Sequence, residues 1–85
     1  MITMHQLKQV MLFQLTNFND EGVSITEETI HKDVLSDDDG LGHINSRQLY
    51  YDVIRFTLKR KGHELKEWPG FWIELTVADL AVRIL

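Results

Sequence analysis

A serine at the start of a predicted helix is the residue of this chain whose position best suits covalent chemistry. Ser46 follows the glycine-containing segment 40–45, GLGHIN, and apolar residues recur after it at helical spacing. The free backbone N–H groups of a helix's first turn favour an anion such as a phosphodiester. We therefore expect an exposed Ser46 hydroxyl that can take a phosphate-linked group. A serine that only caps the helix fits the same residues.

An acidic run before this serine offers a second kind of chemistry. If residues 37–48 are laid over a calcium-binding EF-hand loop, Asp37 and Asp39 take the first and third ligand positions. Leu41 has no side-chain oxygen for the fifth position, and Gln48 replaces the glutamate required at the twelfth. The alternatives here are a degenerate calcium site in a non-catalytic calcium-binding or protein-interaction module, and a solvated acidic loop.

Histidines give no clear sign of a metal site or of catalysis. His5, His31, His43 and His63 lack metal-ligand spacing, so we expect surface or loop positions and no bound metal. His43 lies close before Ser46, which raises the hypothesis of a nucleophile with its base. Neither an oxyanion donor nor a third group can be named, so we predict no catalytic residues and no enzyme activity.

Length and composition exclude several classes of protein. The 85 residues fit a single domain, 1–85, and the absence of cysteine excludes disulfides and thiolate sites. No apolar run is long enough to span a bilayer, and no signal peptide is recognised, so we expect a cytoplasmic monomer. With 9 Lys and Arg against 13 Asp and Glu, the net charge of -4 argues against nucleic acid as the main partner.

Periodicity predicts three helices that must position these residues. One spans about 3–18; a long polar loop over 23–44 follows; and a second helix begins at Asn45 or Ser46 and ends at Gly62. Residues 63–75 read as an irregular aromatic segment, and a last helix follows the cap Thr76. The second helix is apolar around more than half of its circumference, so we expect other helices to surround it.

Charge and aromatic residues are unevenly distributed along these elements. Eight acids and one base lie between Asp20 and Asp39, whereas five bases and one acid lie between Ser46 and Lys61. Three large aromatic residues gather in the irregular segment: Trp68, Phe71 and Trp72. We interpret them as core or lid residues; a slot for a bound group or a docking patch is the functional alternative.

The segment around Ser46 resembles the phosphopantetheine attachment motif of acyl and peptidyl carrier proteins. Ile44-Asn45-Ser46 matches the aliphatic, polar and modified-serine positions, and Leu49 falls where the following helix carries an aliphatic residue. Segments 24–30 and 75–81 resemble the family's stretch after the first helix and the opening of its last helix. Arg47 and the basic second helix depart from the family pattern, which bears on the partner enzymes rather than on the modification.

The resemblance implies an all-α, small three- to four-helix bundle of acyl-carrier-protein type with a long loop between the first and second helices. It implies a freestanding carrier that holds acyl or aminoacyl thioesters on a 4'-phosphopantetheine arm attached to Ser46. Expected partners are a phosphopantetheinyl transferase, an acyl- or amino-acid-activating ligase and a downstream transferase or synthetase, in a specialised lipid, polyketide or nonribosomal peptide pathway. The docking residues we expect on and beside the second helix are Ile44, Asn45, Arg47, Tyr50, Tyr51 and Arg55.

Overall fold

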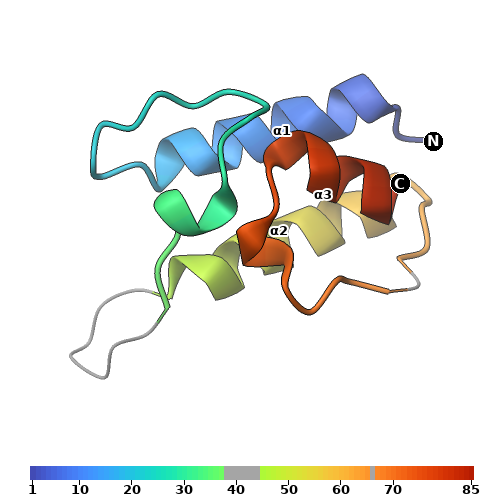
Figure 1. The fold of residues 1–85 in the computed structure, drawn as a ribbon. Coiled ribbons are helices and arrows are strands. Elements are labelled where there is room, and N and C mark those ends of the chain that lie inside the picture. Colours follow the sequence, from blue (N-terminus) through green and yellow to red (C-terminus); the bar gives the residue numbers. More distant parts are fainter. Residues whose placement is uncertain (38–44, 66) are drawn as a thin grey trace.

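Three helices form the main part of the molecule. The computed structural model describes residues 1–37, 45–65 and 67–85. Two 3₁₀-helices accompany the three α-helices, in the order α1 (Met4–Asn17), η1 (His31–Asp33), α2 (Ser46–Arg60), η2 (Trp72–Glu74) and α3 (Val77–Ile84). Helix α1 contacts both α2 and α3 (Figure 1). The prediction of a small, mostly helical fold is therefore confirmed for the described residues, among which no regular strand occurs.

Helix α1 begins and ends where local chemistry predicts. The backbone N–H of Gln6 donates to the Thr3 hydroxyl at 3.1 Å, and the Thr3 N–H donates to the Gln6 side-chain oxygen at 2.9 Å. This reciprocal capping box satisfies two backbone donors that the helix itself leaves unpaired. The helix stops at Asn17, and Gly22 then adopts the left-handed conformation with φ of 69°.

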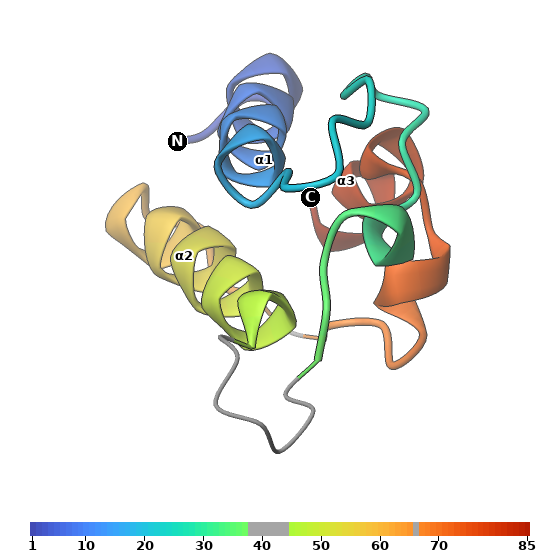
Figure 2. The same cartoon turned by 90° about the vertical axis from the view of Figure 1, so that its left-hand side faces the viewer.

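The core lies between the three helices and is built from one stripe of each. Figure 2 shows the helices arranged around a common centre, with the connection between α1 and α2 closing one side. Ile2 and Leu35 add side chains from outside the helices. Among the described residues, the buried apolar core consists of Ile2, Leu7, Met11, Leu15, Leu35, Tyr50, Ile54, Leu58, Val77, Leu80, Ala81 and Ile84.

Helix α2 forms where predicted but is covered on one side only. Tyr50, Ile54 and Leu58, spaced by four residues, are buried along one stripe. Leu49 is 41% exposed and Phe56 is 61% exposed on the outer side. The expectation of a helix surrounded on most of its circumference is therefore wrong, because α1 packs against one face of α2 and the outer side with Leu49 and Phe56 stays exposed. Beyond Lys61, Gly62 has a φ of 78°, which confirms the predicted left-handed stop.

The connection from α1 to α2 is tied to the start of α3. The backbone N–H groups of Val77 and Ala78 donate to the carbonyl groups of Thr29 and Glu27 at 3.1 and 3.0 Å. These are first-turn donors that α3 cannot pair internally. Helix α3 itself begins at the predicted cap, because the Thr76 hydroxyl accepts from the N–H of Asp79 at 3.1 Å. The long predicted loop is thus an ordered layer in its described part, with η1 packed against η2.

A matched pair of substitutions on α3 tests this packing. Leu80 is fully buried, whereas Val82, two residues along, is 67% exposed. We expect Leu80→Ala to lower the free energy of unfolding by about 2–5 kcal/mol, because it removes core contacts and leaves a cavity. Val82→Ala should change it by no more than about 0.5 kcal/mol. Urea unfolding followed by circular dichroism measures both; equal losses would place α3 in a different orientation.

Candidate functional site at the first turn of α2

Asn45 and Ser46 open α2, as their residue types predict. Asn45 is the N-cap: its side-chain oxygen accepts from the backbone N–H of Gln48 at 2.9 Å. The amide nitrogen of the same side chain donates to the carboxylate of Asp37 at 2.9 Å. Asn45 therefore joins the helix start to the described end of the preceding acidic segment, a structural role that its predicted docking role does not require.

The Ser46 hydroxyl is turned toward Ser36 and away from solvent. Its oxygen accepts from the Ser36 N–H at 2.8 Å, and its O–H donates to the Ser36 carbonyl at 3.3 Å. The Ser36 carbonyl also accepts from the backbone N–H of Arg47 at 3.3 Å. Ser46 is only 7% exposed, so the expectation of an exposed hydroxyl is wrong for this arrangement. We refer to the hydrogen bonds between Ser36 and residues 46–47 as the serine clasp.

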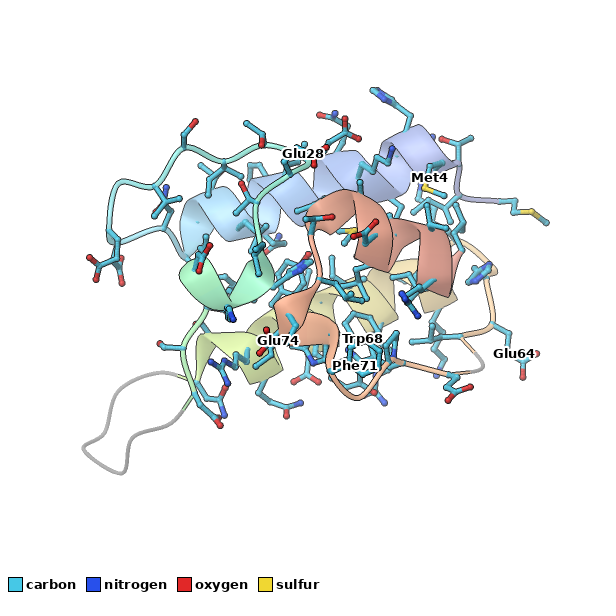
Figure 3. The ribbon with its side chains drawn as sticks, viewed as in Figure 1. Met4, Glu28, Glu64, Trp68, Phe71 and Glu74 are labelled. Atoms are coloured by element: carbon cyan, nitrogen blue, oxygen red, sulfur yellow. The ribbon has the colours of Figure 1, made fainter. Side chains whose placement is uncertain are left out.

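A groove of about 500 Å³ lies beside the clasp, between the first turns of α2 and the segment that leads into η2. Asn45, Arg47 and Tyr51 line it from one side, and Trp68 and Trp72 line it from the other. Trp68 meets the Tyr51 ring edge-on, with ring centroids 4.8 Å apart. Figure 3 labels Trp68 and Phe71, which lie close together in the segment before η2. The two tryptophans both pack against the core, as interpreted, and form an aromatic wall; Phe71 is 57% exposed.

Arg47 brings a positively charged guanidinium to this groove. Its Nε lies 3.5 Å from the Leu35 carbonyl, the limit of a hydrogen bond. The ion pairs among the described residues are Lys8–Glu27 and Lys32–Glu74, and neither involves Arg47. A half-buried guanidinium can bind a phosphate or another anion. The groove thus combines the Arg47 guanidinium and the Asp37 carboxylate with an apolar, aromatic wall.

Tyr50 lies in the core and not on the surface. It is fully buried, and its hydroxyl lies 2.9 Å from Nε2 of His31. Its ring stacks on Trp72 with a centroid distance of 5.6 Å and an interplanar angle of 6°. The prediction of Tyr50 as a docking residue is therefore wrong: among α2 residues it shares the buried stripe with Ile54 and Leu58.

His31 is buried, although a surface or loop position is predicted for it from the sequence. Its Nδ1 lies 2.7 Å from the carbonyl oxygen of Leu75, which can only accept a hydrogen bond. Nδ1 therefore carries the proton of the neutral ring, and Nε2 accepts from the Tyr50 hydroxyl. Trp72 meets the His31 ring edge-on at 5.4 Å. A histidine between the aliphatic positions Ile30 and Val34 is the only signal of burial that the sequence contains.

Burial shifts the pKa values of both His31 and Tyr50. Desolvation lowers the pKa of His31 below its usual value, and the hydrogen bond to the Leu75 carbonyl offsets only part of that effect. Desolvation also raises the pKa of Tyr50 far above that of a free tyrosine. Both side chains are therefore neutral at pH 7, which suits a polar pair enclosed in a small core.

The remaining predicted site residues fall into two groups. Tyr51 is partly exposed beside the groove. The guanidinium of Arg55 lies 5.2 Å from the centre of the Tyr51 ring. Both side chains are thus available on the outer side of α2, where they were predicted. Ile44, Asp39 and His43 lie outside the described residues. Asp37 is described, and no cluster of three or more metal-ligating side chains occurs within the described ranges.

Comparisons with known proteins give no match from which a function could be assigned. No protein-family model matches the chain, and comparisons with curated proteins and with solved structures find no match either. Among the described residues, no helix has both the length and the apolar character needed to cross a membrane.

The buried histidine predicts a pH dependence of stability. Because the pKa of His31 is lower in the folded than in the unfolded chain, the folded chain binds fewer protons. The contribution of neutral His31 to the free energy of unfolding is therefore fully present above the unfolded pKa of about 6.5. It falls as the pH drops below that value, by at most about 1.4 kcal/mol per pH unit. Urea unfolding of wild type and His31→Gln between pH 7.5 and 5, a range of about 2.5 units chosen around that pKa, measures it.

The matched control is His5→Gln, which changes an exposed histidine of α1. This variant should keep the slope of wild type, whereas His31→Gln should lose it. A slope that survives in His31→Gln and disappears in His5→Gln would contradict the assignment of the buried group.

Proposed function

We propose that this chain is a carrier protein that holds acyl or aminoacyl groups on a phosphopantetheine arm attached to Ser46. The observation that carries the proposal is the place of Ser46: it opens an amphipathic helix, next to a cationic and aromatic groove. The carrier-like motif at residues 44–46 and the order of the helices support it. In this role the fold is a small bundle of the acyl-carrier type, and the chain is a substrate of enzymes.

The required group transfer uses one atom of this chain. The Ser46 oxygen attacks the phosphorus of coenzyme A that bears the pantetheine, and a phosphoester bond forms. The phosphoanhydride bond breaks, adenosine 3',5'-bisphosphate leaves, and the hydroxyl proton goes to a base of the transferase. The attached arm supplies a thiol that carries the acyl or aminoacyl group as a thioester.

The serine clasp must open before this reaction. Ser46 Oγ has two hydrogen bonds to the backbone of Ser36, and the Arg47 N–H provides a third at the same place. At about 1 kcal/mol for each intramolecular hydrogen bond, opening costs a few kcal/mol, which the binding energy of a transferase can supply. The closed clasp thus protects the hydroxyl without excluding its modification.

The groove offers the arm a cation beside Ser46 and an apolar surface beyond it. Arg47 follows Ser46 directly and provides a cation for the phosphodiester. Tyr51, Trp68 and Trp72 provide apolar surface for the chain beyond the phosphate. The indole N–H of Trp68 is buried and lacks a hydrogen-bond acceptor among the described residues, while the arm carries amide carbonyl groups.

A loading experiment tests the proposal at a single atom. The protein is incubated with coenzyme A and a broad-specificity phosphopantetheinyl transferase, and its intact mass is measured. We expect one phosphopantetheine addition on wild type and none on Ser46→Ala. That variant should stay folded while losing about 1–3 kcal/mol of stability, because the Ser36 N–H loses its acceptor.

Ser36→Ala is the matched control, because it removes the other serine of the clasp and keeps the backbone groups that hold Ser46. It should load as wild type does. If wild type stays unmodified while a known carrier in the same tube is modified, the proposal fails. Loading of Ser46→Ala but not of Ser36→Ala would move the site to Ser36.

The groove leads to a separate prediction for the loaded protein. Trp68 and Trp72 are the two tryptophans of the chain, so its NMR spectrum contains two indole N–H signals. If the arm lies in the groove, loading should shift both signals, and Arg47→Ala should reduce the shifts by weakening the phosphate contact. Unchanged indole signals on a fully loaded protein would show that the arm lies elsewhere.

A further inference from the structure

The outer side of α2 carries a surface that neither the core nor the groove explains. Arg55, Phe56, Lys59 and Arg60 are all exposed there, and we name these four residues the basic face of α2. A hollow of about 610 Å³ is lined by all four of them. A second hollow of about 390 Å³, toward the segment after Gly62, shares Arg55 and Lys59 with the first.

The charges of the basic face are not neutralised within the described chain. The ion pairs found there, Lys8–Glu27 and Lys32–Glu74, belong to other parts of the molecule. Arg60 lies over the ring of Phe56 at 5.9 Å, a contact that orients the guanidinium without cancelling its charge. One carboxylate borders each hollow, Asp52 in the first and Glu64 in the second.

An exposed aromatic residue stands in the middle of these charges. Phe56 is 61% exposed, and Leu49, two turns earlier on the same side, is 41% exposed. Val53 lies between them along the helix and lines the first hollow. Aromatic and arginine side chains are enriched in protein interfaces, and an apolar centre with charged flanks is the usual arrangement.

We propose that the basic face of α2 binds an acidic, amphipathic segment of a partner protein. Carboxylates of that segment pair with Arg55, Lys59 and Arg60, while an apolar side chain packs against Phe56. The charge complementarity supports an acidic partner, and the exposed ring supports an amphipathic one. In the proposed carrier role, which this inference deepens, the face is the surface to which a partner enzyme docks; binding itself does not need the arm.

A protein fits this face better than a nucleic acid or a lipid surface. The chain has a net charge of -4, so a long polyanion is repelled over most of the molecule. Asp52 and Glu64 at the two hollows add local repulsion. A short segment with a few carboxylates contacts the three cations alone.

The test uses two synthetic helical peptides of equal length with leucine on one face. One has glutamate at its charged positions, and the other has lysine at the same positions. Both are titrated into Ser46→Ala protein labelled with ¹⁵N, in low salt, so that modification cannot contribute. We expect the acidic peptide to bind and to shift amide signals of residues 52–60, and the basic peptide to leave them unchanged.

Charge reversal on the face should then weaken binding of the acidic peptide. Arg55→Glu with Lys59→Glu should raise its dissociation constant at least about tenfold. Phe56→Ala should weaken binding at any salt concentration, because it removes an apolar contact. Arg83→Glu, a charge reversal on α3, should leave the dissociation constant unchanged. Circular dichroism of each variant checks that its fold is retained.

Three results would overturn the inference: equal binding of both peptides, an unchanged dissociation constant in the charge-reversed protein, or tighter binding to single-stranded DNA or anionic vesicles than to the acidic peptide. None of them bears on loading of Ser46, which is measured on the wild-type chain with coenzyme A. Loading without peptide binding would leave the carrier proposal intact, and peptide binding without loading would leave the basic face as an interaction surface alone.

Discussion

The His31 side chain holds together three parts of the chain that are far apart in sequence. It lies in η1 of the connection, bonds to the carbonyl group that follows η2, and meets the Tyr50 hydroxyl of α2. Each of these polar groups would be costly to bury alone, and together they satisfy one another. In a core this small, that arrangement fixes one position of the connection relative to the helices.

The candidate site depends on the same arrangement. Trp72 stacks on Tyr50 and meets His31 edge-on. The same side chain also lines the groove. The serine clasp lies at the far end of the connection that His31 fixes. The groove and the hydroxyl beside it therefore depend on the packing of the core, and His31 contacts the groove wall through Trp72.

Some basic side chains of this chain form ion pairs, and those on the outer side of α2 lie elsewhere. Lys8 and Lys32 pair with Glu27 and Glu74, which links α1 and η1 to neighbouring segments. The bases of the outer side of α2 instead lie over aromatic rings or in solvent. An acidic chain that leaves one helix face basic keeps a surface of opposite sign to the rest of the molecule, which is useful for recognition and of little use for stability.

The sequence by itself determined the helices and their ends, because capping and stop signals act within a few residues. Asn45 and Thr76 open their helices as predicted, and Gly62 closes α2. Thr3, for which no cap was predicted, opens α1 by the same local chemistry. Only the tertiary structure decided which side chains are buried. Ser46 meets Ser36 across 10 residues, Tyr50 meets His31 across 19, and His31 meets Leu75 across 44. Periodicity on one helix contains no information about such partners. The sequence alone therefore predicts Ser46, Tyr50 and His31 at the surface, and the packing of the connection buries them.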